Sequence, residues 1–405
     1  MTQPLPIFDQ AEFLHSHRFP PHLDTQYTQD YAFSVEFLKS YAGRPGTFNS
    51  YRREIERFLQ WTWHIQKMTL SQLQRQDLEK YIRFCQNPDR EWIGPHKVPR
   101  FLKEQDKRTP NPNWRPFVMP YRKINEETSN QFLLSQGAIQ EIFAILSTYF
   151  NFLIADEYLQ INPVALMRQK SKFIQKNQQA APIRRLSLTQ WQTVLDTVEH
   201  LASMNPDKHE RTRFILHAMY GMYLRISELC ASSRWIPTMN DFSKDHHGNW
   251  WFTTVGKGNK KRQIAVSEMV LESLKRWRTF LGLPPLPSPG ETQYLIPKIK
   301  GFGPISETVT IRRLIQICFD LAAQKLKQQQ QFEEAQHLEA ATVHWLRHTS
   351  ISEDVKTRPR EHVRDDAGHA SSATTDRYID VELTERHRSA KHKKIIPETQ
   401  NIEEQ

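Results

Sequence analysis

Two stretches near the C-terminus decide the fold: HWLRHTS at residues 344–350 and AGHASSATTDRYID at residues 367–380. His344 and Arg347 are three residues apart, so on a helix they lie on the same face. Tyr378 follows His369 by nine residues. The C-terminal half of the chain is therefore where the sequence places its candidate site.

Two further stretches lie upstream. GMYLRISEL at residues 221–229 sets Arg225 and Glu228 three apart, which predicts one helical face on which the acid orients a basic neighbour. WWFTTV at 250–255 and RQIAV at 262–266 are β-type runs, and the GKGNKK between them has the glycines and asparagine of a tight turn. The sequence therefore predicts a hairpin with Lys257 at its tip.

These residue types suit one chemistry. Breaking a DNA phosphodiester without metal requires a nucleophile, stabilisation of the charge on the non-bridging oxygens, and a proton for the departing 5′-oxygen. Guanidinium forks match phosphate oxygens and stay charged at any working pH. A lysine on a hairpin tip suits the proton, and imidazoles can hydrogen-bond or move protons.

RISEL, GKGNKKRQIAV, HWLRHT and GHASSATTDRY resemble, in order and spacing, the motifs of the tyrosine recombinase (phage integrase) family. The resemblance covers roughly residues 187–390 and extends more weakly over about 27–170. It implies that Arg225 and Arg347 clamp the scissile phosphate, with Glu228 in support. It further implies hydrogen bonds from His344 and His369, a proton from Lys257, and a 3′-phosphotyrosyl link at Tyr378. No metal, ATP or other cofactor is implied.

Competing interpretations exist for each group. The two arginines could form structural ion pairs with Glu228 or Asp354, and Lys260 could replace Lys257 as the general acid. His344 and His348 have a spacing that could bind zinc, but the sequence offers neither the HExxH glutamate nor a third ligand. Two other functions stay open: a type IB topoisomerase-like enzyme that relaxes DNA, and a non-catalytic DNA-binding regulator.

Composition indicates a polyanionic partner. The formal net charge is +10, and 38% of the residues are hydrophobic, enough for real cores. Double-stranded DNA is the expected partner, with an anionic membrane surface as the competing explanation. The candidate DNA-contacting side chains are Arg52, Arg53, Lys260, Lys261 and Arg262.

Cysteine usage agrees with an intracellular protein. The three cysteines, Cys85, Cys230 and Cys318, are far apart and suggest neither a disulfide framework nor a zinc cluster. No stretch approaches the length of a membrane span, and the opening residues lack the basic and apolar blocks of a signal peptide. We expect a cytoplasmic, nucleoid-associated protein of bacterial or phage type.

The predicted fold is mainly α with a small antiparallel β-sheet. Helices are expected in SYRREIERFLQWTW and GAIQEIFAILSTYFNFLI, near 211–231, 267–281, 306–327 and 342–355, and after an N-cap at Ser187 or Thr189. The predicted organisation is an extension at 1–26, a helical core-binding domain at 27–170 with an irregular insertion at 87–130, a linker at 171–186, a catalytic domain at 187–392 and a tail at 393–405.

The resemblance also implies an assembly. Recombination of this kind uses four protomers on paired DNA sites, so a homotetramer is expected on DNA. Accessory factors that bend DNA or set direction are further possible partners. The activity expected is site-specific recombination in the integration or excision of a mobile element.

Overall fold

The protein has two compact units, Met1–Ala180 and Ala181–Gln405. The computed structural model describes residues 3–16, 19–104, 107–119, 132, 134–165, 184–256, 259–369, 371, 374–375 and 391. Each unit has its own hydrophobic core. Most of the described elements are helices, and the strands form small sheets, which confirms the predicted fold class.

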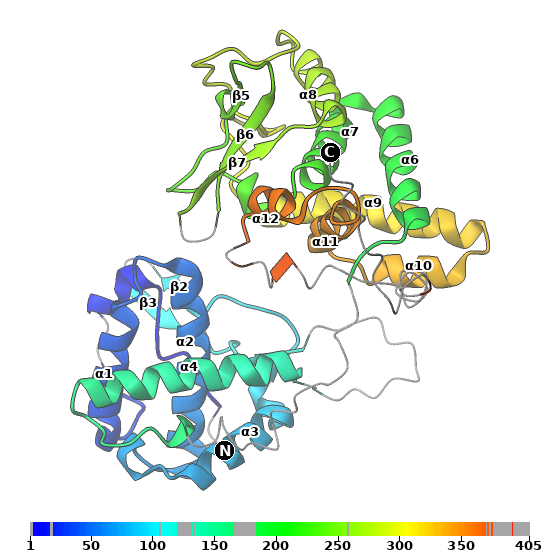
Figure 1. Cartoon of the computed structure of the whole chain (residues 1–405). Helices are drawn as coiled ribbons and strands as arrows, with labels where there is room; N and C mark the ends of the chain where they lie inside the picture. Colours follow the sequence, from blue (N-terminus) through cyan, green and yellow to red (C-terminus); the bar gives the residue numbers. More distant parts are fainter. Residues whose placement is uncertain are drawn as a thin grey trace, which may run out of the picture. The chain divides into compact units, whose positions relative to one another are not determined.

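The first unit packs around α2 (Pro45–Gln60), which lies against α1 (Thr28–Lys39) and α4 (Gln136–Ala155) (Figure 1). The expected helix at SYRREIERFLQWTW is confirmed, since Ile55, Phe58 and Leu59 are fully buried. The helix continues as a π-helical segment, Trp61–Gln66. The unit also contains α3 (Arg75–Gln86) and the short helical segments Ala11–Ser16, Thr25–Tyr27, Leu70–Gln72 and Arg90–Trp92.

Helix α4 corrects one expectation. It is long and apolar enough, by length and composition alone, to cross a membrane, so the statement that no stretch reaches that length was wrong. Its apolar side chains instead form part of the core of the first unit. The buried residues are Ile139, Ile142, Phe143, Ile145, Leu146, Tyr149, Phe150 and Leu153.

The expected irregular insertion is more ordered than predicted over its described part. Strands β1 (Ile93–Gly94) and β4 (Phe117–Val118) pair in parallel, and β2 (Phe101–Glu104) pairs antiparallel with β3 (Lys107–Pro110). Trp92 and Phe117 are buried in the same core as α2 and α4. These short strands lie among prolines and basic residues and have no clear two-residue periodicity. The sequence of this segment therefore predicts a loop and not strands.

The second unit begins with α6 (Leu188–Met204), whose N-cap is Ser187, one of the two predicted residues: its hydroxyl accepts from the Gln190 amide. The helices that follow are α7 (Pro206–Gly221), α8 (Glu268–Phe280), α9 (Thr308–Gln328), α10 (Phe332–Glu339), α11 (Val343–Asp354) and α12 (Arg360–Ala367). The helices expected near 267–281, 306–327 and 342–355 are confirmed. The helix expected near 211–231 ends ten residues early, at Gly221 instead of 231.

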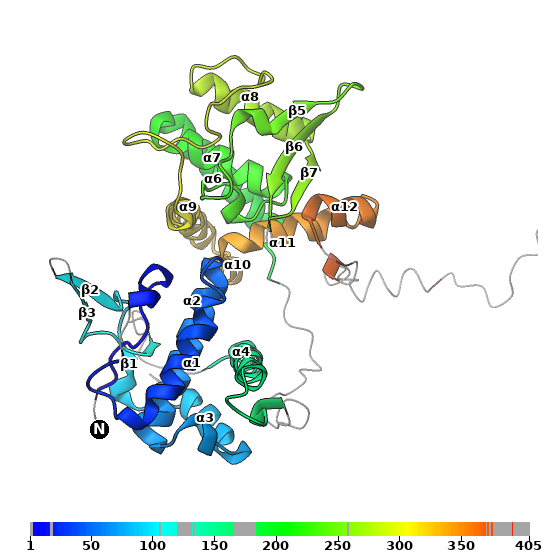
Figure 2. The same ribbon diagram turned by 90° about the vertical axis from the view of Figure 1, so that its left-hand side faces the viewer.

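The predicted hairpin is confirmed as β6 (Trp250–Val255) and β7 (Lys261–Ala265), with Val255 opposite Lys261. A third strand, β5 (Phe242–Lys244), pairs with β6, and two 3-10 turns, Ile226–Glu228 and Met239–Asp241, precede it. Helix α12 lies against β7, and α11 packs on α7 (Figure 2). This arrangement brings the segment after α7, strand β7 and the C-terminal helices to one place.

Candidate functional site

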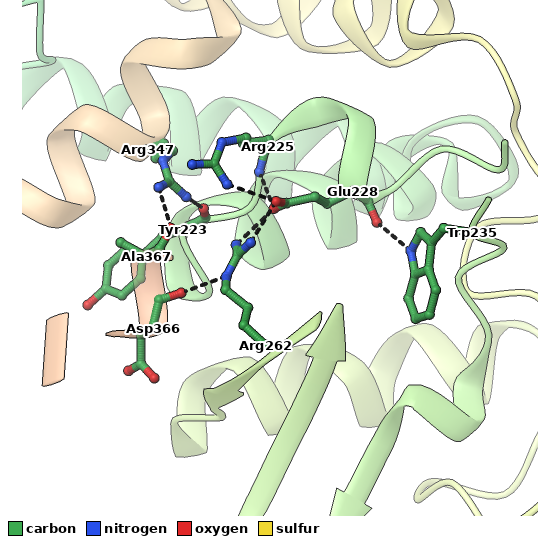
Figure 3. A network of polar contacts seen from close by, with 8 residues as sticks. All are labelled: Tyr223, Arg225, Glu228, Trp235, Arg262, Arg347, Asp366 and Ala367. Atoms are coloured by element: carbon green, nitrogen blue, oxygen red, sulfur yellow. Dashed lines mark hydrogen bonds and ion pairs between the residues drawn. The ribbon is translucent and has the colours of Figure 1, made fainter. Parts of the chain in front are cut away.

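Glu228 is the centre of a buried network of arginines (Figure 3). Its carboxylate accepts hydrogen bonds from the Arg225 amide at 2.8 Å and from Arg225 Nη1 at 3.0 Å. Arg262 donates to both oxygens of the same carboxylate, at 2.7 and 2.9 Å. Burial alone would raise the pKa of Glu228, but the bonds from Arg262 and Arg225 lower it below its usual value. Glu228 is therefore a carboxylate at neutral pH.

The contact between Arg225 and Glu228 forms by a different route from the predicted helical face. Arg225 has an extended backbone, with φ of −76° and ψ of 145°, and precedes the 3-10 turn Ile226–Glu228. Glu228, at the third position of that turn, reaches back to the Arg225 amide as in a capping box. The extended backbone leaves the Arg225 side chain 30% exposed, beside the carboxylate that orients it.

Arg262, on β7, joins this turn to α12. Its Nε donates to the Asp366 carbonyl at 3.0 Å while its other nitrogens hold Glu228. Two glycines make room for it: a Cβ at Gly256 would lie 3.0 Å from Arg262 Nη1, and one at Gly368 would lie 2.7 Å from Arg262 Cδ. Gly368 also has a φ of 66°, which ends α12 in the left-handed region. The structure thus shows Arg262, expected as a DNA contact, to be a half-buried partner of Glu228.

Arg347 is the most buried of the three arginines, at 2% exposure. From α11 its Nη1 donates to the Tyr223 carbonyl, and its Nη2 donates to the Ala367 carbonyl at 2.5 Å (Figure 3). Tyr223 has a φ of 49°, a left-handed conformation that is uncommon for a residue other than glycine. Arg347 therefore fixes the backbone just before Arg225 and just before the turn that leads to His369.

A second set of polar contacts lies behind Arg347. The Tyr223 hydroxyl donates to Asp354 and accepts from Arg358 Nη1 at 2.7 Å. Arg358 Nη2 bonds the Asp366 carboxylate at 2.6 Å. Asp354, one of the two acids considered as ion-pair partners for Arg225 and Arg347, instead contacts Tyr223 and Arg358. The carboxylates of Asp354 and Asp366 are thus directed to Arg358.

The charges around this network do not balance. Of the described side chains drawn in Figure 3, three guanidiniums, of Arg225, Arg262 and Arg347, accompany two buried carboxylates, of Glu228 and Asp366. Asp366 presents its backbone carbonyl to Arg262, since its carboxylate bonds Arg358. An excess of positive charge with guanidinium forks suits a bound phosphate.

The histidines are neutral neighbours of these cations. Burial, followed by the charges of Arg347 and Arg225, lowers the pKa of His369 to about 4. Burial and the same two arginines lower the pKa of His344. His369 Nδ1 lies 2.9 Å from Thr375 Oγ1, and the ring of His344 lies edge-on to that of His348. At neutral pH both imidazoles can donate from one nitrogen and accept at the other.

Several expected residues are placed elsewhere. Tyr378 and Lys257 lie outside the described residues, as do residues 171–183 of the expected linker and the tail at 393–405. Lys260 and Lys261 are exposed at the hairpin turn. In the first unit, Arg52 is buried and donates to the Asp9 carbonyl and Asn49, while Arg53 pairs with Glu54 and Glu141. In the described part of the chain, no group of three or more His, Cys, Asp or Glu residues could hold a metal ion.

Glu228→Gln is expected to destabilise the second unit by about 3–5 kcal/mol at pH 7, because two guanidiniums lose their buried counter-charge. The folded-state pKa of Glu228 is lowered, so its stabilising effect is present above its unfolded pKa and is lost as the pH falls through the folded value. The difference between wild type and variant should therefore shrink at acidic pH. Urea unfolding from pH 7 downward measures it, and Glu272→Gln, at an exposed acid on α8, is the control.

Comparisons with known proteins agree with this geometry. Residues 184–385 match the sequence model of the phage integrase family. Tyrosine recombinase XerD of Rickettsia conorii (strain ATCC VR-613 / Malish 7) is 28% identical over 150 residues, which are 37% of this chain. The matched segment spans 46% of that relative's length, somewhat less than half.

Solved structures share the fold. A post-cleavage complex of the XerH site-specific recombinase with a palindromic difH substrate has a TM-score of 0.57 and 14% identity, over 95% of this chain and 93% of that one. Its pre-cleavage complex with difH has a TM-score of 0.51, also at 14% identity, over 96% and 99% of the two chains. The family match covers the segment that carries Arg225, Glu228, Arg262 and Arg347. The chain belongs to the phage integrase, or tyrosine recombinase, family.

Proposed function

We propose that this protein is a site-specific DNA recombinase that cuts and rejoins strands through a 3′-phosphotyrosyl intermediate. The observation that carries the proposal is that Arg225 and Arg262 converge on the Glu228 carboxylate, while Arg347 is fixed nearby by the Tyr223 and Ala367 carbonyls (Figure 3). The single negative charge of a phosphodiester, shared by its two non-bridging oxygens, would offset part of this positive charge. The family membership and the shared fold support the same activity.

The arginines divide the work according to their surroundings. Arg225, with its side chain 30% exposed, is the guanidinium that can reach a phosphate, and Glu228 holds it in orientation. Arg347 is positioned by two backbone carbonyls, and it contributes positive charge and hydrogen bonds to the phosphate. Arg262 positions Glu228 and takes no part in the reaction itself. A preorganised set of donors of this kind stabilises the pentacovalent transition state with no reorganisation of solvent.

The covalent step is assigned to Tyr378 and Lys257. The phenol oxygen of Tyr378 attacks phosphorus, the bond from phosphorus to the 5′-oxygen breaks, and Lys257 gives that oxygen its proton. The phosphate stays esterified to the 3′-oxygen and to tyrosine, so a 5′-hydroxyl can later reverse the exchange without ATP or metal. The ordinary pKa of tyrosine is about 10, so the positive pocket must stabilise the developing phenolate.

His344 and His369 act as neutral groups in this scheme. Because the pKa of His369 is about 4, its imidazole is uncharged at pH 7 and contributes a hydrogen bond to a phosphate oxygen. The pKa of His344 is also lowered, by burial and the nearby arginines, so His344 has a free-base nitrogen that can accept the tyrosine proton. Neither imidazole needs to become protonated before DNA binds.

Lys257→Ala is expected to slow strand cleavage by about 10²–10⁴-fold, the usual contribution of a general acid. A substrate with a 5′-bridging sulfur, whose leaving group needs no proton, should restore most of the rate. Single-turnover cleavage of the two substrates measures the rescue. Lys260→Ala, which removes an exposed lysine from the same turn, is the matched control. Rescue of the Lys260 variant instead would transfer the general-acid role to that residue.

The assembly and the biological setting extend the proposal. We expect two functional domains: residues 27–170 bind the core DNA, and residues 187–392 contain the catalytic residues. We further expect a homotetramer on paired DNA sites. The DNA substrate places the enzyme in the cytoplasm, at the nucleoid. Integration or excision of a mobile element is the act that such an exchange performs, with accessory factors to set its direction.

Identification of the target DNA tests the whole proposal. Genomic fragments that stay bound through a denaturing wash would be sequenced to define the site. Plasmids with two copies of that site should then yield recombinant products. Relaxation of supercoils without joined products would indicate topoisomerase activity, and binding without covalent capture would indicate a regulator.

A further inference from the structure

The first unit contains a cleft that the recombination chemistry does not use. Its volume is about 630 Å³, and it lies between α2 and the strand-containing segment that follows β1. The extension at the N-terminus contributes Asp9 and Gln10 to its wall. The basic residues along it are Arg52, Arg53, Arg57, His96, Lys97, Arg100, Arg108 and Arg115. All of its lining residues belong to the first unit.

Aromatic rings hold four of these guanidiniums in place, and Arg52 lies 5.2 Å from the ring centre of Phe48. Arg57 lies 4.1 Å from the ring centre of Phe117, and Arg100 lies 4.8 Å from that of Trp114. Arg108 lies 4.5 Å from the ring centre of Phe13. Stacking on an aromatic face fixes the plane of a guanidinium and leaves its edge for hydrogen bonds. The cleft is therefore preorganised and not a loose surface of mobile cations.

The acids around the cleft neutralise only some of its cations. Ion pairs connect Arg53 and Arg57 to Glu54, Arg100 to Glu56, and Arg108 to Asp9. Arg53 also contacts Glu141. In the described part of the chain, no ion pair is found for the three remaining arginine and lysine residues of the cleft. These are Arg52, Lys97 and Arg115.

Two buried donors in this wall also lack a partner among the described residues. Arg52 and Arg57 are 9% and 8% exposed, and the Nε of each makes no hydrogen bond. A buried guanidinium N–H without an acceptor costs free energy, which a bound acceptor would recover. Burial, opposed by Asp9, lowers the pKa of Arg52. The cleft therefore combines two N–H donors that have no acceptor among the described residues with positive charge that its carboxylates do not fully neutralise.

We propose that this cleft binds a phosphate group, presented either by the DNA backbone or by a free phosphate compound. Guanidinium pairs match the oxygens of a phosphate in number and in geometry. The DNA source rests on the proposed recombinase function, in which the backbone of the bound duplex would pass over the segment at 96–118. Binding of a free phosphate compound would instead make the cleft a small-anion site that does not depend on DNA.

The full-length double variant Lys97→Gln/Arg115→Gln tests the proposal at its least buried cations. A matched variant, Arg83→Gln/Arg90→Gln, removes the same charge from exposed positions of this unit outside the cleft. Duplex affinity is measured against salt. Loss of two phosphate contacts should lower the slope of log K against log salt by about 1.8 and the affinity by at least about tenfold. Lys97→Gln alone, at an exposed residue, should lower the slope by about 0.9 even if the double variant folds poorly.

The second arm uses inorganic phosphate at matched ionic strength against chloride. A rise in the melting temperature of wild type that the double variant lacks indicates a free-phosphate site, and a change in the DNA slope indicates the backbone. No effect of the double variant in either arm, or an equal effect of the matched control, overturns the proposal. Covalent capture of DNA at saturation is recorded in parallel. Absence of covalent capture by the wild type would contradict the recombinase function. The salt dependence of DNA binding and the phosphate-dependent melting temperature would still test phosphate binding by the cleft.

Discussion

Tyr378→Phe is expected to abolish the covalent protein–DNA adduct on a nicked suicide substrate while leaving the duplex Kd unchanged. Phenylalanine keeps the ring and removes only the oxygen that attacks phosphorus. No neighbouring group can take over, because the imidazoles beside the arginines would form a labile P–N bond in place of a stable ester. Denaturing gel analysis of the trapped adduct measures the effect, with a gel-shift titration for binding.

Tyr294→Phe is the control for this substitution. Tyr294 belongs to the same unit, is 36% exposed, and forms an isolated β-bridge with Thr238. Its phenylalanine variant should form adduct at the wild-type rate. An adduct that persists in the Tyr378 variant would remove that residue from the mechanism, whatever else binds the phosphate.

Arg347→Lys is expected to slow cleavage by about 10²–10³-fold with DNA binding largely kept. Lysine preserves the charge, but its single ammonium nitrogen cannot reproduce the planar fork with which two nitrogens of Arg347 bond Tyr223 and Ala367. The turn before Arg225 and the turn before His369 would therefore lose their common tether. Stability should also fall, by about 1–3 kcal/mol, because a buried carbonyl is left without its donor.

Two measurements separate these effects. Single-turnover cleavage, well below the melting temperature of the variant, reports the chemistry, and thermal unfolding reports the lost tether. Arg312→Lys, at an exposed residue of α9, is the matched control and should change neither. A variant at Arg347 that cleaves at the wild-type rate would show that the fork geometry is not needed.

Much of the fold could be predicted from local patterns. The helices α8, α9 and α11 and the β6–β7 hairpin follow from apolar periodicity and turn residues, and their observed bounds lie close to the expected ones. Helix α7 ends earlier than predicted, at Gly221, because the chain turns through the left-handed Tyr223 there. A positive φ at a tyrosine is imposed by tertiary contacts, here with Arg347 and Arg358, and local sequence does not reveal it.

Most residues of the site could be predicted from the sequence, but the contacts between them could be predicted less well. The motifs identified Arg225, Glu228 and Arg347, which the structure brings together with Arg262 (Figure 3). Arg262 is one of the candidate DNA contacts that the sequence analysis names beside Lys260 and Lys261. Its pairing with Glu228 depends on β7 lying beside the turn after α7, a contact between residues 34 positions apart. The two glycines that accommodate it, Gly256 and Gly368, are the one sequence signal that could have indicated a close approach.

Most of the polar contacts behind the site could not be read from sequence. Tyr223, Asp354, Arg358 and Asp366 are ordinary residues of the segments after α7 and around α11 and α12. Asp354 and Arg358 have the i, i+4 spacing of a helical ion pair, but nothing in the sequence marks Tyr223 or Asp366 as their partner. Similarly, the basic cleft of the first unit combines α2 with a segment more than thirty residues further on. Only the tertiary fold reveals which of the many arginines share a site.

The most direct test is to locate the covalent bond. Trapped adduct from a suicide substrate would be digested with protease and nuclease, and the peptide with a nucleotide attached would be sequenced by mass spectrometry. The account predicts a single modified peptide with a phosphodiester from Tyr378 to the 3′-oxygen of the DNA. A link to a 5′-phosphate, or to any residue other than Tyr378, would contradict it.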